Sequence, residues 1–583
     1  MTPTTAPTTP PLPRRRRCPR SARAAAAGAL GLALVAGCTS GSDGGGGDGG
    51  LFGGGDEPAV ELAAVPAVAV LDAEGDRSVP ASQVLFAASP VVVVVDEAAD
   101  VAAAGARAEE LGVPVLVVAA PGPEPTASPS PAGSATASDA PAAPQPPTAS
   151  DAPTAPATDG AAPGTSPAGY APGADPAAVV AEVERLGAEQ VLAADGASRT
   201  WAEGALDAEV LDAATADVDA PEREEGDEDG AGSPTPSATE GSGEGLVALS
   251  TGQAVDVAPA ATARAAGATV QDVPGGDPRA DGELVDQLSA APPASVLALS
   301  PAFGDVPRLT ERMEVVETGV QLPGGGQVPF PGRHMVALYG SPGTPSLGVM
   351  GEQDVDAAVE RAKEVAAEYD DLVEDPVVPT FEIITTVASA SAGEDGDYSY
   401  ELDPEVVRPW IEAAAENGLY VVLDLQPGRT DFLTQAQRYE SLLTYPGVGL
   451  ALDPEWRLEP DQRHLRQVGR VGVEEVDAVG DWLAQLTADN DLPPKVFLLH
   501  QFQNRMITDR QDLDMSHDEL VPLVHADGHG TPSMKDDTYQ ALQVDAPAGM
   551  RWGWKNFYDE DTPTLTPAQT MAVEPTPDFV SYQ

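Results

Sequence analysis

The chain has 583 residues, a formal net charge of −61 and two cysteines. Acidic residues are spread along the sequence, whereas a surface that binds nucleic acid needs clustered lysine and arginine, so nucleic acid is not expected as a partner. Length alone suggests about three or four domains. Long tracts rich in Pro, Gly, Ser and Ala reduce the expectation to two folded domains.

The N-terminus has the organisation of an export signal. Arginines at positions 14–17 precede an apolar stretch, about residues 24–36, which is shorter than the roughly 20 residues of a membrane span. The run Leu34-Val35-Ala36-Gly37-Cys38 resembles a bacterial lipobox. The resemblance implies that residues 1–37 are a signal peptide and that Cys38 carries diacylglycerol. The alternative is an ordinary secretory leader with an incidental cysteine, and the export route, Sec or Tat, stays open.

We therefore expect a lipoprotein, lipid-anchored at the extracellular face of the cell membrane. The other cysteine, Cys18, leaves with the signal peptide, so the mature chain is expected to contain no disulfide. Abundant alanine, glycine and arginine with little lysine are typical of a GC-rich genome, such as that of an actinobacterium.

Three tracts are predicted to be disordered because their composition buries too little apolar surface to offset the entropy of ordering. Residues 38–57 form a Gly-, Ser- and Asp-rich tether, which spaces the folded part from the membrane. Residues 121–173 are dense in Pro, Ala, Thr and Ser, and residues 221–245 are acidic and rich in Gly and Ser.

Residues 58–310, apart from these insertions, are predicted to form an α/β domain with a doubly wound parallel sheet, because short apolar strands alternate with helices. The predicted strands are Val68–Leu71, Val91–Val95, Val113–Val118, Gln190–Ala193, Leu246–Leu249, Ala268–Val273 and Val296–Leu299, and the predicted helices are Asp100–Leu111 and Pro176–Leu186.

Three motifs in this region resemble the cell-wall-binding type 2 repeat of Gram-positive surface proteins: Phe86–Pro90, Gly112–Leu116 and Leu186–Val191. The resemblance covers roughly residues 58–215 and implies binding to a cell-wall polysaccharide or peptidoglycan. The family's usual Asp-Ala-Leu segment is missing after the first strand. The alternative is a flavodoxin-like fold without a ligand.

Residues 332–575 are predicted to form a TIM-type (β/α)8-like barrel, because strands and helices alternate over this length. The predicted strands are Met335–Tyr339, Thr380–Thr386, Tyr420–Leu425, Val448–Leu452, Val496–Leu499, Leu520–Val524 and Met550–Phe557. The predicted helices are Val355–Tyr369, Pro404–Asn417, Asp431–Leu443 and Glu474–Leu486.

Polar residues collect near the ends of successive predicted barrel strands, where TIM barrels place their active sites. As substrate-binding residues we predict Glu382, Asp424, Gln426, His500, Gln501, Asp527, Trp552 and Trp554. Polar strand ends also occur in barrels without activity, since each strand must leave the core. Tryptophan rings stack on sugar rings by apolar contact, and the alternative for Trp552 and Trp554 is core packing.

The pair Asp453 and Glu455 is the strongest candidate for catalysis. Residues two apart in a strand face the same side, so both carboxylates are expected to face one cleft. Neighbouring carboxylates separate their pKa values, which suits the hydrolysis of a glycosidic bond. Segment Gly449–Trp456 resembles the fourth-strand Asp-x-Glu of chitinase-like and lysozyme-like TIM-barrel glycosidases.

That resemblance implies a retaining, carboxylate-dependent glycosidase with Glu455 as general acid and Asp453 as its neighbour. The chitinase-like pattern has a further Asp where this chain has Ala451, Pro454 interrupts the motif, and no Tyr-Asp is found at the sixth strand. The alternative is that Asp453 starts a loop in which Glu455 caps the next segment.

Two functions follow from these observations. The first is a surface glycoside hydrolase-like protein that acts on or recognises a cell-envelope glycan, and the second is a non-catalytic wall-binding or scaffolding protein with a degenerate barrel. A third, metal-dependent deacetylation, would require His500, His525, Asp527 and His529 to converge. Glycines at 528 and 530 make that segment loop-like, so we assign no metal and no cofactor.

Overall fold

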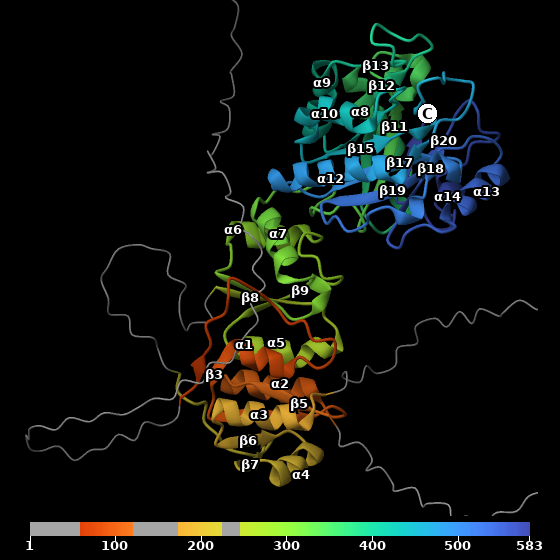
Figure 1. The fold of residues 1–583 in the computed structure, drawn as a ribbon. Helices are drawn as coiled ribbons and strands as arrows, with labels where there is room; N and C mark the ends of the chain where they lie inside the picture. The colour runs from red at the N-terminus through yellow and green to blue at the C-terminus, as the bar shows by residue number, and fades with distance from the viewer. Residues whose placement is uncertain (1–58, 120–172, 224–244) are drawn as a thin grey trace, which may run out of the picture. The chain divides into compact units, whose positions relative to one another are not determined.

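A computed structural model describes residues 59–119, 173–223 and 245–583 (Figure 1). The signal peptide, Cys38 and the tether lie outside these ranges, as does nearly all of the two predicted insertions. Within the described ranges, no helix is both long enough and apolar enough to cross a membrane.

The N-terminal region is α/β with parallel sheets, which confirms the predicted fold class. Its strands divide between two four-stranded parallel sheets, with orders β5-β4-β6-β7 and β2-β10-β8-β9. The first consists of β4 (Val91–Asp96), β5 (Val115–Val118), β6 (Gln190–Ala193) and β7 (Glu209–Asp212); the second consists of β2 (Val68–Val70), β8 (Leu246–Ser250), β9 (Thr269–Asp272) and β10 (Ser295–Ala298). A short antiparallel pair joins β1 (Glu61–Leu62) to β3 (Phe86–Ala88).

Helices accompany both sheets, and every residue of β4 is buried, as expected for a parallel strand covered on two faces. The helices of this region are α1 (Ser78–Leu85), α2 (Val101–Leu111), α3 (Pro176–Leu186), α4 (Gly196–Ala205), α5 (Val257–Ala265), α6 (Gly282–Ala290) and α7 (Val306–Glu317).

The end of α3 gives a physical reason for the Leu-Gly-Ala sequence in the third of the three motifs described above. Asp175 caps the start of this helix by accepting a hydrogen bond from the Ala177 amide, and Gly187 ends it with φ 68°. Glycine adopts this left-handed conformation without the steric cost that a Cβ would impose. The Leu-Gly-Ala sequence at residues 186–188 is therefore a helix terminus that leads into β6.

The C-terminal region is a closed barrel of eight parallel strands with helices around it (Figure 1). The strands are β11 (His334–Gly340), β12 (Val377–Ala388), β14 (Tyr420–Leu425), β15 (Val448–Leu452), β17 (Lys495–Gln501), β19 (Leu520–Ala526), β20 (Arg551–Asn556) and β21 (Phe579–Tyr582). β11 closes the barrel because it pairs with both β12 and β21. The sequence did not reveal β21.

The barrel helices include α8 (Val355–Ala367), α9 (Pro404–Glu416), α12 (Val473–Asp489), α13 (Pro532–Gln543) and α14 (Pro567–Thr570). The single helix predicted over 431–443 is instead two short ones, α10 (Phe432–Arg438) and α11 (Glu440–Leu443). A short strand, β13 (Ser399–Glu401), pairs antiparallel with the last residues of β12.

Apolar side chains fill the barrel interior towards the amino ends of its strands. This cluster includes Met335, Ala337, Val422, Leu498 and Phe579, each with 0% of its surface exposed. Further along the same strands the inward residues become polar and charged. The site therefore rests on a packed apolar floor at the carboxyl end of the barrel.

Candidate active site

A cavity of about 550 Å³ opens at the carboxyl end of the barrel strands. Its lining combines carboxylates, a lysine and aromatic rings, which include Tyr339, Gln426, Asp453, Glu455, Trp456, Phe502, Asp527, His529, Lys555 and Phe557. This is the end of a parallel barrel where the loops after the strands meet, as predicted from the polar strand ends.

Asp453 and Glu455 both line the cavity, although they do not lie in a strand as predicted. β15 ends at Leu452, and Pro454–Trp456 form a one-turn 3₁₀ helix that Asp453 caps by accepting a hydrogen bond from the Glu455 amide at 3.2 Å. The alternation of a strand is therefore not what brings the two side chains together. The tight turn after the strand does so instead.

Burial changes the proton affinity of both carboxyls. It raises the pKa of Glu455 to about 7, and Asp527 adds to the rise because like charges resist ionisation together. Burial also raises the pKa of Asp453 well above its ordinary value. Near neutral pH Glu455 therefore exists in both protonated and ionised forms, and the proton affinity of Asp453 is also raised.

Asp527 lies in the opposite electrostatic environment. Its Oδ1 is 3.3 Å from Nζ of Lys555, and its Oδ2 is 3.1 Å from Nδ1 of His500. Burial alone would raise the pKa of Asp527, but the charges of Lys555 and His500 hold it below its ordinary value. Asp527 is thus an ion-paired carboxylate in the same cavity as Glu455, whose pKa is raised.

Tyr339 connects the cavity to the layer beneath it. Its hydroxyl donates to Oδ2 of Asp424 at 2.9 Å and accepts from Nε2 of Gln426 at 3.3 Å. Nζ of Lys555 lies 3.4 Å from the centre of the Tyr339 ring, a cation–π contact. Burial raises the pKa of Asp424 to about 6 and the pKa of Tyr339 well above its ordinary value.

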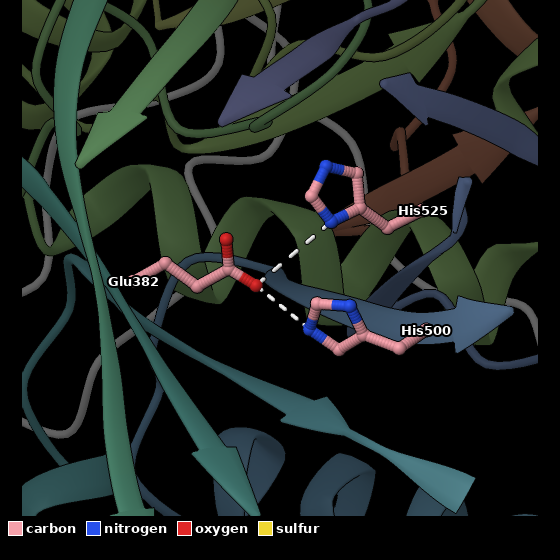
Figure 2. A group of neighbouring side chains, drawn as sticks. All are labelled: Glu382, His500 and His525. Atoms are coloured by element: carbon pink, nitrogen blue, oxygen red, sulfur yellow. Dashed lines mark ion pairs between the residues drawn. The ribbon is translucent and has the colours of Figure 1, made fainter. Parts of the chain in front are cut away.

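Below the cavity lies a fully buried group of Glu382, His500 and His525, each 0% exposed (Figure 2). Oε1 of Glu382 is 2.8 Å from Nε2 of His500 and 3.9 Å from Nδ1 of His525. Burial lowers the pKa of His525 to about 4. Burial opposes the charged form of His500 and of Glu382 too, but their mutual attraction raises the pKa of His500 and lowers the pKa of Glu382.

The structure divides the predicted substrate-binding residues into three groups. Gln426 and Asp527 line the cavity, together with the predicted catalytic pair. Glu382, Asp424 and His500 are fully buried beneath it, so the expectation that they contact substrate directly is corrected.

Gln501, Trp552 and Trp554 form the third group, and their predicted role in the cavity is wrong. Trp554 is 1% exposed and packs in the core against Tyr539, with its indole nitrogen donating to Asn556 at 3.0 Å. Trp552 also packs against Tyr539, at a ring distance of 6.0 Å.

The reason for this error is strand alternation. Because Lys555 faces the barrel interior, both Trp552 and Trp554 lie on the outer face of β20. Gln501 follows the inward His500 and accepts a hydrogen bond from Arg510 at 2.6 Å.

Two residues of the cavity lining, Tyr339 and Lys555, were not among the predicted site residues. Tyr339 was included only in the predicted strand Met335–Tyr339, and Lys555 only in the predicted strand Met550–Phe557. The signal for Lys555 was its charge within a strand, since a lysine there needs a partner once it is buried. Burial lowers its proton affinity, but Asp527 and the other carboxylates raise the pKa of Lys555 above its ordinary value.

Asp453 and Glu455 line the cavity and Phe502 forms part of its wall, whereas Met506 and Trp554 are buried and do not line it. The four residues required for a deacetylase do not converge as proposed, because His529 lies against Phe557 at a ring distance of 5.9 Å. His500 and His525 converge on Glu382 instead (Figure 2).

No protein-family model and no curated protein matches the sequence. A solved glycoside hydrolase family 6 enzyme from Coprinopsis cinerea is 14% identical over 38% of this chain and 60% of that chain, with a TM-score of 0.19. A cellobiohydrolase mutant in its closed form is 14% identical over 42% of this chain and 63% of that chain, also with a TM-score of 0.19. The chain thus covers about three fifths of each of these structures.

The class of protein is therefore set by the barrel itself. It is an α/β protein with a closed eight-stranded parallel barrel whose carboxyl end holds a carboxylate-rich cavity.

Proposed function

We propose that the protein is a retaining glycoside hydrolase that uses carboxyl groups in the barrel cavity to cleave a glycan of the cell envelope. One observation supports this most. Glu455 and Asp527 line the same cavity; burial raises the pKa of Glu455 to about 7, whereas Lys555 and His500 hold the pKa of Asp527 below its ordinary value. Two carboxyls whose environments separate their charge states are what glycosidic cleavage requires.

In this proposal Glu455 is the general acid and donates its proton to the oxygen of the leaving sugar. Asp527 faces the positive charge that develops at the sugar carbon and attacks it to form a glycosyl intermediate, which water then hydrolyses. Asp453 lies beside Glu455, and the charge of Glu455 adds to the rise in the pKa of Asp453. Trp456, which is half-buried in the cavity wall, provides an aromatic face for a sugar ring.

The location of the protein is the second part of the proposal. A diacylglycerol on Cys38 would tether the chain at the outer face of the membrane, and the N-terminal α/β region would bind wall polysaccharide or peptidoglycan. Two features of the sequence support this arrangement: the lipobox-like run that ends at Cys38, and the three repeat-like motifs that follow one another between residues 86 and 191. Its test is replacement of Cys38 by alanine, which is expected to release the protein into the culture medium.

The activity is tested by incubating the purified protein with peptidoglycan and with secondary wall polymers, followed by product analysis. We expect soluble saccharides from the wild type and none above background from Glu455→Gln. Hydrolysis with retained anomeric configuration, followed by NMR, would support the nucleophile role of Asp527. Full activity of Glu455→Gln on the same polymer would exclude the proposed acid.

A non-catalytic wall-binding role is the second candidate, and one observation favours it. Ala451, where chitinase-like enzymes have a carboxylate, is fully buried in the apolar barrel interior. Binding of a wall polymer without release of products would support this candidate over the hydrolase.

A further inference from the structure

The group beneath the cavity brings three potential metal-ligand atoms together from three separate strands. Glu382 comes from β12, His500 from β17 and His525 from β19. Both imidazole rings are directed at one carboxylate oxygen of Glu382 (Figure 2). One ligand atom from each residue lies within 4.8 Å of the other two.

These atoms are buried without hydrogen-bond partners among the described residues. Both oxygens of Glu382, Nε2 of His500 and Nδ1 of His525 are in this state. The 2.8 Å contact between Glu382 and His500 is short, yet its direction is not that of a hydrogen bond. Buried polar atoms without partners are costly, so such a concentration indicates a missing cation or donor.

The outer nitrogen of each ring also faces a polar atom, although Nδ1 of His500 makes no hydrogen bond in this geometry. Nδ1 of His500 lies 3.1 Å from Oδ2 of Asp527, and Nε2 of His525 lies 3.3 Å from Oγ of Ser581. Metal-binding histidines characteristically place one nitrogen on the ion and the other against a carboxylate or another hydrogen-bond partner. Both histidines therefore have the surroundings of metal ligands.

We propose that Glu382, His500 and His525 form a binding site for a divalent transition-metal ion, with Zn²⁺ as the expected occupant. Two imidazoles and a carboxylate are a ligand set that suits this ion. Tetrahedral ligands about 2.0 Å from zinc are separated from one another by roughly 3.3 Å. The distances of 2.8 and 3.9 Å from Glu382 to the two histidines lie on either side of that value.

Asp424 stands beside the site and completes its surroundings. Its Oδ1 is 3.7 Å from Nε2 of His500 and has no hydrogen-bond partner among the described residues. It is an acceptor for a water molecule in the fourth position of the ion. The ion would fix His500, and through it the orientation of Asp527 in the cavity wall.

The site is tested on the purified protein by removing metal with a chelator, adding Zn²⁺, and measuring bound zinc by mass spectrometry after dialysis. We expect about one tightly held Zn²⁺ per chain in the wild type. Glu382→Gln and His525→Gln should each lose it, and Ser581→Ala should weaken binding by about 10- to 100-fold. Circular dichroism confirms that each variant is folded.

Two control variants make the test specific. His334→Gln removes a histidine at the opposite end of the barrel, and His517→Gln removes one from an exposed group with Asp481 and Asp514. Both should keep the zinc. The proposal is overturned if the wild type retains none, or if His517→Gln loses it while Glu382→Gln does not. If the wild type retains no zinc, His500 is instead a charged imidazolium between Glu382 and Asp527. These measurements need no enzymatic activity, so they are independent of the proposed hydrolysis.

Discussion

Nδ1 of His500 lies 3.1 Å from Oδ2 of Asp527, which links a carboxylate in the cavity wall to the fully buried group below it. Lys555 contacts the other oxygen of the same carboxylate at 3.3 Å. Asp527 is therefore held from two sides, and its charge and orientation depend on Lys555 in the cavity wall and on His500 buried beneath it.

Replacing Asp527 with asparagine keeps the shape of the side chain but removes the anion. We expect kcat on the cleaved glycan to fall by about 10²- to 10⁴-fold. Steady-state kinetics measure the effect, with Asp537→Asn on the exposed face of α13 as the matched control. A kcat within twofold of the wild type would remove Asp527 from the mechanism.

The pH dependence of the rate should report Glu455. Its pKa is raised to about 7, and as a general acid it is active only when protonated, so kcat should fall as the pH rises through about 7. In Glu455→Gln this dependence should disappear from whatever activity remains. The charged groups that act on Glu455 are Asp424, His500, Asp527 and Lys555. A wild-type rate that stays constant between pH 6 and pH 9 would contradict the assignment.

The same shift predicts a cost in stability. The folded-state pKa of Glu455 lies above the ordinary value of 4.5, so the folded state binds the proton more tightly than the unfolded state. The contribution of Glu455 to the free energy of unfolding is thus highest below about pH 4.5 and falls by up to roughly 3 kcal/mol as the pH rises to 7 and above.

Glutamine cannot ionise and avoids this loss. Glu455→Gln should therefore unfold at a higher temperature than the wild type at pH 8, with a smaller difference at pH 4. Thermal unfolding at the two pH values measures both. A variant that is less stable than the wild type at pH 8 would mean that Glu455 is not destabilised by burial.

The sequence alone predicted the fold class, but it did not predict β21, the strand that completes the barrel. Strands such as Tyr420–Leu425 and Val448–Leu452 were predicted at their observed bounds, because both consist mostly of apolar residues and lie between predicted helices. β21 was missed because its four residues include Ser581 and follow a segment rich in proline. Only pairing with β11 and β20 identifies this segment as a strand.

The sequence also predicted part of the candidate site. Sequence position placed Asp453, Glu455 and Asp527 at strand ends, and all three line the cavity. Sequence position did not show which side chains of β20 point into the barrel, because Trp554 and Lys555 are neighbours and either could have faced inwards. The convergence of Glu382 with His525 depends on how the closed barrel places distant strands.

The double replacement of Lys555 and Asp527 tests their ion pair. Lys555→Met alone leaves a buried carboxylate without its main counter-charge and should lower the free energy of unfolding by about 3–5 kcal/mol. In the double variant with Asp527→Asn the loss should be smaller than the sum of the two single losses. Urea unfolding of the wild type, the two single variants and the double variant gives the coupling energy between the two side chains. Strictly additive losses would show that the two side chains do not interact.

Trp456 and Trp554 should respond differently to replacement. Trp456 lines the cavity, so Trp456→Ala should raise KM for the glycan with little change in the free energy of unfolding. Trp554 is buried in the core, so Trp554→Ala should lower the free energy of unfolding by about 3–5 kcal/mol. Kinetics and urea unfolding on the same two variants separate these effects. An unchanged KM in Trp456→Ala would show that this ring does not bind sugar.

The central claim is that Glu455 protonates the leaving group in the barrel cavity. The measurement that tests it most directly compares wild type and Glu455→Gln on two substrates of the same sugar, the natural glycan and an aryl glycoside whose leaving group needs no proton. The account predicts that Glu455→Gln loses about 10²- to 10⁴-fold in kcat/KM on the glycan and keeps most of its activity on the aryl glycoside. Equal losses on both substrates, or none on either, would contradict it.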